Sequence, residues 1–323
     1  MRAAIEAQTM SIKVLITCPP MLGIMQEFKP YFTERGIEVV CPRVVQTLSE
    51  SQIIDLVPQC DGWIIGDDPA TAAVFRAGRS GRLKAAVKWG VGVDNVDVKA
   101  AKMQGIPVTN TPDMFGGEVA DLAMAYVTIL ARETCRIDRE VRGGGWPKPR
   151  GISLQQKVLG LIGFGDIGKH VARRALAAGM AMIVYDPAYR PDASIEGVSP
   201  AEWPSKIEAC DFLVLTCSLN DANRHMLNQD TLQRAKPGVR IVNVARGALI
   251  DEAALVTALT SGQVHSAALD VYETEPLPLS SPLRGFECCV FGSHNASNTS
   301  EAVWRTSERA AGLLCSFLGL TDR

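Results

Sequence analysis

The chain has 323 residues, enough for two domains with a core each, and its 33 basic and 35 acidic side chains leave a formal net charge of −2. No basic run points to nucleic acid or an anionic membrane surface as a partner, and we expect neither a signal peptide nor a membrane span. The nine cysteines lack Cys-x-x-Cys spacing, which favours reduced thiols in a cytoplasmic protein and gives no sign of a metal site.

Strand-like and helix-like segments alternate along the chain in two series. The first series predicts strands at residues 13–17, 37–40, 62–65, 85–91 and 106–109, with helices such as 71–77 and 97–104 between them. The second series begins at Val158 and predicts further strands at residues 182–185, 212–216, 240–244, 267–271 and 289–291. This rhythm is typical of a parallel doubly wound sheet, so we predict an α/β fold with two such domains.

Three segments predict how the two series are connected. Residues 119–131 form a long apolar helix between the series, and the glycines and prolines of residues 142–149 require a loop. Residues 301–318 form a last helix, which we expect to fold back on the first domain. The predicted domains are therefore residues 1–112 with 295–323, and residues 113–294.

A glycine pattern opens the second series. An apolar strand runs into Gly163, Gly165 and Gly168 in G-x-G-x-x-G spacing, and a helix-forming stretch follows. Gly163 allows a tight turn, Gly165 lets the main chain approach a pyrophosphate, and Gly168 packs the helix against the strand. The helix N-terminus adds N–H groups and a positive dipole end. A glycine pattern by itself is more often a loop, but here strand, helix, second strand and acid stand where a dinucleotide site requires them.

That acid is Asp186, which ends the second strand eighteen residues after Gly168. A carboxylate at this position accepts hydrogen bonds from the ribose hydroxyls and repels a 2′-phosphate. The sequence therefore predicts NAD, rather than NADP, as the cofactor.

Three polar residues follow predicted strands in the second series, namely Arg246, Glu275 and His294. Ligands of open α/β sheets bind beyond the carboxyl ends of the strands, so we expect these side chains to lie together. An arginine fork can bind a carboxylate and polarise the adjacent carbonyl, a histidine can exchange the hydroxyl proton, and a carboxylate can orient that histidine. These roles suit hydride transfer at a small 2-hydroxy acid. Taken singly, each residue is also compatible with a surface ion pair or a solvated turn, and only their joint placement favours catalysis.

The other histidines fit the role of general base less well. His170 lies on the helix after the glycines, His225 in a polar stretch, and His265 at the amino end of its strand. We therefore predict His294 as the general acid and base.

Five ordered segments resemble the D-isomer-specific 2-hydroxyacid dehydrogenases, and the phosphoglycerate dehydrogenase-like branch most of all. They are residues 88–97 (KWGVGVDNVD), 158–168 (VLGLIGFGDIG), 242–247 (VNVARG), 269–276 (LDVYETEP) and 292–297 (GSHNAS). The resemblance covers the chain from Lys13 to about Leu318. It implies a Rossmann NAD-binding domain inserted into a flavodoxin-like substrate domain.

The resemblance also implies roles for further residues. Arg246, Glu275 and His294 correspond to the catalytic triad, and Asp270 to the residue that meets the nicotinamide carboxamide. Asp166 and Ile167 would lie on the pyrophosphate, and Cys217, Val244 and Ala245 beside the cofactor. Backbone N–H groups of Gly90, Val91 and Gly92 would bind the substrate carboxylate, with Lys88 nearby. The family further implies a homodimer built on the cofactor domains, with residues 119–131 in the contact.

Some residues depart from the family pattern. Ser218 stands where a proline is usual, and Phe115 where an asparagine is common. Gly66, Asp67 and Asp68 stand where phosphoglycerate-specific members tend to carry an arginine, and the two acids would oppose a phosphate. Because Lys88 offers one positive charge nearby, a phosphorylated substrate stays open. An NAD(H)-sensing regulatory protein with little turnover is the alternative to an enzyme, although the intact triad favours the enzyme.

Overall fold

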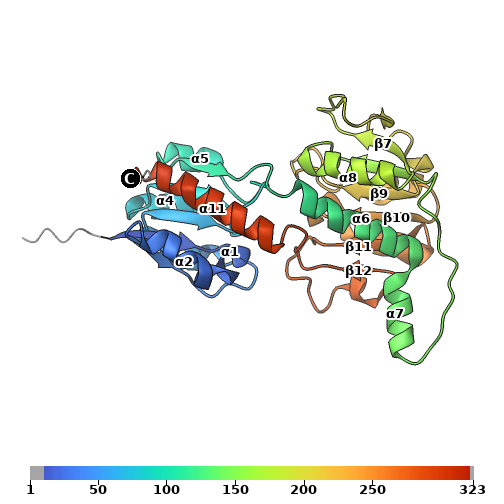
Figure 1. The fold of residues 1–323 in the computed structure, drawn as a ribbon, viewed down its shortest axis with the longest axis horizontal. Coiled ribbons are helices and arrows are strands. Elements are labelled where there is room, and N and C mark those ends of the chain that lie inside the picture. Colours follow the sequence, from blue (N-terminus) through green and yellow to red (C-terminus); the bar gives the residue numbers. More distant parts are fainter. Residues whose placement is uncertain (1–10, 321–323) are drawn as a thin grey trace, which may run out of the picture. The chain divides into compact units, whose positions relative to one another are not determined.

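The structure is a computed structural model and describes residues 11–320. The described chain forms two compact units. Unit 1 contains the residues up to Met114 and those from Thr299 onward, and unit 2 spans Phe115–Asn298. Figure 1 shows a sheet with covering helices in each unit.

Unit 1 is built on a five-stranded parallel sheet in the order β2-β1-β3-β4-β5, the flavodoxin-like order. Its strands are β1 (Ile12–Ile16), β2 (Ile37–Val40), β3 (Gly62–Ile65), β4 (Ala85–Lys88) and β5 (Val108–Asn110). Its helices are α1 (Pro19–Gly23), α2 (Met25–Thr33), α3 (Glu50–Leu56), α4 (Ala72–Ser80), α5 (Val98–Met103) and α11 (Ser300–Phe317), with the short 3-10 helix η1 (Val57–Gln59). As expected for the last helix, α11 packs on β3 and β4 of this unit (Figure 1).

Unit 2 is built on a seven-stranded parallel sheet in the order β12-β11-β10-β9-β6-β7-β8. Its strands are β6 (Val158–Ile162), β7 (Ala181–Tyr185), β8 (Val198–Pro200), β9 (Phe212–Leu215), β10 (Val239–Asn243), β11 (Val264–Leu269) and β12 (Val290–Phe291). Its helices are α6 (Gly116–Arg132), α7 (Thr134–Arg142), α8 (Asp166–Ala177), α9 (Gln229–Arg234) and α10 (Glu252–Ser261), with 3-10 helices η2 (Ile207–Ala209), η3 (Gly247–Leu249) and η4 (Pro282–Gly285). The first six strands of unit 2 in chain order, β6 to β11, have the Rossmann arrangement. The direction in which successive strands are added reverses between β6 and β9, which makes this the switch point of the sheet. Both units confirm the predicted doubly wound α/β fold.

Several boundaries differ from the sequence prediction, and two of them bear on the site and on the segment between the two series of strands. The strand predicted for residues 85–91 ends at Lys88, since Gly90 turns the chain with a φ of +130°. There the N–H of Gly90 donates to Oγ1 of Thr111 at 2.8 Å. The loop predicted from residue 142 begins one residue later, because α7 occupies Thr134–Arg142. No residue of α7 is buried, so this helix lacks the buried apolar run that marks the other helices in the sequence.

At the amino ends of the strands, both sheets have an aspartate that binds the first strand and pairs with a lysine. In unit 1, the carboxylate of Asp61 accepts the N–H of Lys13 at 2.9 Å and pairs with Lys84 at 3.1 Å. In unit 2, the carboxylate of Asp211 accepts the N–H of Val158 at 2.9 Å and pairs with Lys236 at 2.7 Å. Each aspartate therefore fixes the first strand of its unit at the edge opposite the carboxyl ends.

Within residues 11–320 no helix is long and apolar enough to cross a membrane.

Candidate active site

The glycine pattern forms a tight loop between β6 and α8. Gly163 has a φ of +98°, and a Cβ at this position would lie 2.7 Å from the backbone nitrogen of Cys217. A Cβ at Gly168 would lie 2.2 Å from the carbonyl oxygen of Gly163, so helix and strand pack too closely for a larger residue. A Cβ at Gly165 meets no atom within 4 Å, and this open face stands at the N-terminus of α8. The loop offers backbone N–H groups to an anion there.

Asp186 follows β7 and is bound to this loop. Its Oδ2 accepts the N–H of Phe164 at 2.6 Å, and its Oδ1 accepts the N–H of Ala188 at 2.8 Å. A carboxylate has about four acceptor positions, so two backbone bonds leave capacity for ribose hydroxyls. The carboxylate thus faces the glycine loop and keeps acceptor positions for a ligand.

A cavity of about 1090 Å³ lies over the switch point of the unit 2 sheet. Four of the residues expected at the cofactor line it, namely Gly163, Gly165, Asp186 and Cys217. The other expected residues, which the cavity lining does not include, are Asp166, Ile167, Gly168, Val244, Ala245 and Asp270. Burial raises the pKa of Cys217 to about 11, which keeps this thiol protonated near neutral pH. The volume, the open helix terminus and the oriented carboxylate together fit a dinucleotide.

Several lining residues were not predicted from the sequence. They come from the segment around β8 and from the loop after β9, and include Glu202, Trp203, Asn220, Asn223 and Met226. These residues belong to irregular segments without a repeated spacing, so the sequence carried no signal that would have found them.

The histidine and the carboxylate that were predicted to be catalytic lie together. Nδ1 of His294 lies 2.8 Å from Oε2 of Glu275, and both side chains are about one fifth exposed. Oε1 of Glu275 accepts the N–H of Tyr272 at 3.0 Å, which fixes the carboxylate. Because Nδ1 faces Glu275, proton exchange with a ligand falls to Nε2.

Asp270 holds the segment that carries this histidine. His294 has a left-handed backbone with a φ of +54°, and its N–H donates to the carbonyl oxygen of Asp270 at 2.7 Å. The Asp270 carboxylate accepts the N–H groups of Asn295 at 3.1 Å and Ala296 at 2.9 Å. Burial raises the pKa of Asp270, and these N–H groups oppose that rise. The carboxylate thus stabilises a backbone turn that a histidine adopts only at a cost.

Arg246 follows the neighbouring strand. Its backbone carbonyl accepts a hydrogen bond from Nδ2 of Asn243 at 2.9 Å, and its Nη1 donates to the carbonyl of Ala245 at 2.8 Å. The next residue, Gly247, packs so closely on Tyr272 that a Cβ would overlap the Tyr272 backbone. The backbone around Arg246 is therefore fixed in one conformation.

The three predicted catalytic residues follow three adjacent parallel strands. Asn243 at the end of β10 pairs with Leu269 of β11, and Leu269 pairs with Phe291 of β12. Arg246, Glu275 and His294 thus start from one edge of the sheet, where the glycine loop also lies.

Unit 1 has its own polar cluster at the carboxyl edge of β3 and β4. Lys88 is almost fully buried, and its Nζ lies 2.9 Å from Oδ1 of Asp67. Asp68 is buried, accepts the N–H groups of Leu48 and Gly66, and has a pKa raised by that burial. The positive charge of Lys88 is therefore already paired with a carboxylate. The expected role of Gly90, Val91 and Gly92 in carboxylate binding stays a prediction.

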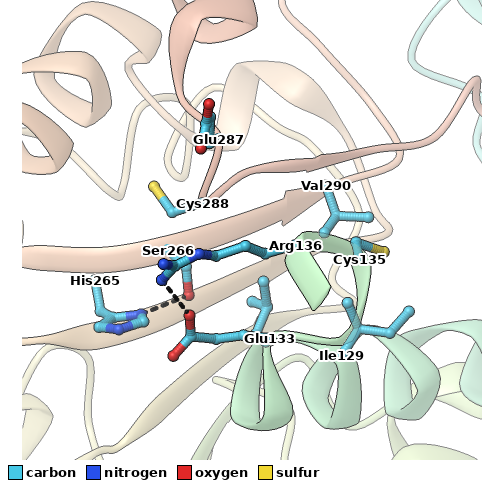
Figure 2. Close-up of a pocket in the computed structure, with 10 residues that line it drawn as sticks. Ile129, Glu133, Cys135, Arg136, His265, Ser266, Glu287, Cys288 and Val290 are labelled. Carbon is cyan, nitrogen blue, oxygen red and sulfur yellow. Dashed lines mark hydrogen bonds and ion pairs between the residues drawn. The ribbon is translucent and has the colours of Figure 1, made fainter. Parts of the chain in front are cut away.

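A second cavity, of about 220 Å³, lies at the opposite end of the unit 2 strands (Figure 2). His265 and Ser266 at the start of β11, Arg136 of α7 and Cys288 line it. A hydrogen bond from Cys289 lowers the pKa of Cys288 to about 7, and the same contact raises the pKa of Cys289. In Figure 2, Arg136 is turned to Glu133 and His265 to Ser266, so neither side chain is aimed at a ligand.

Comparison with known proteins agrees with this geometry. Residues 124–296 match the model of the D-isomer specific 2-hydroxyacid dehydrogenase NAD binding domain. The chain is 36% identical over 278 residues to a hydroxypyruvate reductase of Thermotoga maritima, covering 84% of this chain and 90% of that protein. It is 37% identical over 259 residues to a D-3-phosphoglycerate dehydrogenase of Synechocystis, covering 79% of this chain and 46% of that protein.

A solved structure gives the same result for the fold. The TT0316 protein from Thermus thermophilus superimposes with a TM-score of 0.85 and 31% identity, covering 95% of this chain and 97% of that one. The chain belongs to the D-isomer specific 2-hydroxyacid dehydrogenase family, as an NAD-dependent oxidoreductase of 2-hydroxy and 2-oxo acids.

Proposed function

We propose that the protein interconverts a small D-2-hydroxy acid and its 2-oxo acid, with Arg246, Glu275 and His294 as the catalytic residues. The contact of 2.8 Å between His294 and Glu275, at the sheet edge that also carries the glycine loop, is the observation that carries this proposal. NAD supplies or accepts the hydride when bound.

Each of the three residues has a separate role. His294 gives a proton to the carbonyl oxygen in reduction and takes it back in oxidation, and Glu275 holds the ring and favours its protonated form. Arg246 binds the substrate carboxylate through its fork and polarises the reacting carbonyl.

The cofactor is held mainly by backbone groups of the glycine loop. Gly163, Gly165, Asp166, Ile167 and Gly168 bring the start of α8 to the pyrophosphate. Asp186 accepts the ribose hydroxyls and selects NAD against NADP. Cys217, Val244, Ala245 and Asp270 complete the cofactor site.

The substrate that we favour has no phosphate. One relative is named for hydroxypyruvate and another for 3-phosphoglycerate, so the family leaves both classes open. In this chain the ion pair with Asp67 already balances Lys88, and Asp68 adds a further carboxyl group. A phosphate would meet a cluster without net positive charge, whereas a neutral small substituent would meet no such penalty.

One panel of assays tests the proposal. Reduction of glyoxylate, pyruvate, hydroxypyruvate and 3-phosphohydroxypyruvate is followed with NADH and with NADPH. We expect steady NADH oxidation with an unphosphorylated acid, a much lower kcat/KM with the phosphorylated one, and little use of NADPH. Tight NADH binding without turnover across the panel would instead support a regulatory NADH sensor. Efficient use of NADPH would contradict the role given to Asp186.

We also propose a homodimer formed through α6. The inner face of this helix is buried on α8, β10 and β11. Its outward face carries Asp121, Ala125, Thr128 and Arg132 as exposed residues, with Leu122, Met124 and Ile129 half-buried. The half-buried apolar residues of this face suit a contact with a second copy of the chain. The mass from light scattering decides this, and a mass of one chain would reject it.

A further inference from the structure

A second histidine–carboxylate pair lies in unit 2. Nε2 of His225 is 2.7 Å from Oε1 of Glu273. The nitrogen itself is buried and, among the described residues, makes no aligned hydrogen bond, so the contact rests on distance and is an ion pair when the imidazole is protonated. His225 has a left-handed backbone with a φ of +52°. A strained histidine with a buried, imperfectly satisfied nitrogen requires an explanation that its loop position does not supply.

The backbone around His225 connects the loop after β9, which lines the large cavity, to the segment after β10. Its N–H donates to the carbonyl of Ala248 at 2.8 Å. Leu227 donates to the carbonyl of Leu249 at 3.1 Å and accepts the N–H of Asp251 at 2.9 Å. Asn223 and Met226, just beside His225, line the large cavity. His225 therefore sits between the cofactor cavity and the catalytic loops.

Glu273 connects this histidine to the catalytic carboxylate. It lies two residues before Glu275 and shares a reciprocal contact with Glu252 at the start of α10. The N–H of Glu273 donates to Oε1 of Glu252 at 2.8 Å, and the N–H of Glu252 approaches Oε1 of Glu273 at 3.5 Å. Burial raises the pKa of Glu252, and the charges of Glu273 and Glu275 raise it further. Three carboxyl groups are thus close enough to influence one another.

We propose that His225 and Glu273 form a positioning pair that holds the Glu275 loop and balances the negative charge around the Glu275–His294 pair. This inference rests on the proposed catalytic function. In the pair as proposed, an imidazolium at His225 offsets the charge of Glu273, which would otherwise add to those of Glu252 and Glu275 behind the catalytic histidine. Further charged residues joined to the pair by sequence or by backbone contact are Arg224, next to His225, and Asp251 at the N-terminus of α10, whose N–H donates to the carbonyl of Leu227.

Charge balance predicts opposite effects for the two partners. If the pair is charged as proposed, His225→Gln removes its positive charge, leaves Glu273 uncompensated and makes the surroundings of His294 more negative. Glu273→Gln removes a negative charge and does the reverse. A more negative environment favours a protonated histidine. The titration midpoint of His294 should therefore move to higher pH in His225→Gln and to lower pH in Glu273→Gln.

The chain contains four histidines, so NMR can follow each ring directly in the intact protein. We expect shifts of about half a pH unit in opposite directions, the order expected of one nearby, partly screened charge. The pH dependence of kcat/KM in 2-oxo acid reduction should move in the same directions. A double variant should return near the wild-type midpoint.

The control is His265→Gln, which removes a histidine at the amino end of β11 without changing the midpoint of His294. A merely structural pair would lower kcat or the melting temperature in both variants but leave the His294 midpoint in place, or move it in one direction only. Either result overturns the inference. If wild type turns over no 2-oxo acid, the proposed function fails, while the NMR midpoints still decide whether the two pairs are coupled.

Discussion

At the scale of single residues, the position of His294 defines what its loss should do. The ring is held at Nδ1 by Glu275, and its backbone by Asp270. Asparagine keeps a polar side chain of similar length but cannot exchange a proton. We expect His294→Asn to lower kcat by roughly 10²–10⁴ while the Kd of NADH changes little. Steady-state rates and a fluorescence titration measure the two quantities. Near-normal turnover would remove His294 from the catalytic residues.

The substitution Arg246→Lys tests whether the geometry of the guanidinium group matters, because it keeps the positive charge. Lysine keeps the positive charge but loses the planar two-point fork. If one arm binds the carboxylate and the other polarises the carbonyl, Arg246→Lys should raise KM and also lower kcat. NADH affinity should stay close to that of wild type. An altered KM with an unaltered kcat would make Arg246 a docking residue only, and a loss of NADH affinity would place it with the cofactor.

At the scale of elements, the contact between α8 and β6 depends on one missing side chain. A Cβ at residue 168 would lie 2.2 Å from the carbonyl oxygen of Gly163, which belongs to the turn proposed to hold the pyrophosphate. We expect Gly168→Ala to lower the melting temperature and weaken NADH binding by about tenfold or more, because helix and turn must separate.

The matched control for this prediction is Gly117→Ala in α6. A Cβ at Gly117 meets no atom within 4 Å, so this alanine should leave stability unchanged or raise it slightly, by about 0.5–1 kcal/mol. Thermal unfolding and NADH titration of both variants make the comparison. Equal NADH affinities in the two variants would show that the close contact at Gly168 does not shape the cofactor site.

The bounds of some buried strands could be predicted from the sequence, whereas those of other strands and the exposed helix α7 could not. The strands at Ile37–Val40 and Gly62–Ile65 have their predicted bounds, because apolar runs end at clear turn residues. The strand predicted from Ala267 begins at Val264, since His265 interrupts the apolar run. The exposed α7 carries surface pairs such as Arg136 with Glu140 and buries no residue, so no buried apolar run marks it in the sequence.

Some residues of the candidate site could be predicted from the sequence, and others could not. Arg246, Glu275 and His294 could be predicted, because each follows a strand whose carboxyl end is a fixed place in the fold. The contact between His225 and Glu273 could not, because the loop after β9 sets it without periodic spacing. Trp203 and Asn223 were missed for the same reason. Long-range packing of irregular segments, rather than local propensity, decides such contacts.

At the scale of the whole molecule, the two units have the same arrangement of residues at the two ends of their strands. Each carries its candidate ligand-binding residues at the carboxyl edge of a parallel sheet, and each fixes the amino edge with one aspartate, Asp61 or Asp211. Burial would raise the pKa of both carboxyl groups, but a backbone N–H and lysine side chains outweigh it and lower the pKa of each. Because these aspartates lie far along the strands from the catalytic edge, stability and catalysis can be changed separately.

Asp61→Asn and Asp211→Asn should therefore each destabilise their own unit, by about 1.5–3 kcal/mol for a lost charge-assisted hydrogen bond, with kcat little changed. A lowered pKa in the folded state adds stability above the unfolded value of about 3.9, and this stability is lost as pH falls through the folded pKa. Wild type should thus lose stability on acidification more steeply than either variant. Hydrogen exchange resolved by peptide assigns each loss to unit 1 or unit 2, since a single unfolding curve of a two-domain chain would not. Asp138→Asn on the exposed face of α7 is the control, because the pKa of Asp138 is also lowered, by its hydrogen bond with Arg142, yet water screens that pair. A loss of stability in the control as large as in Asp61→Asn, or a loss spread evenly over both units, would contradict the assignment of one clamp to each sheet.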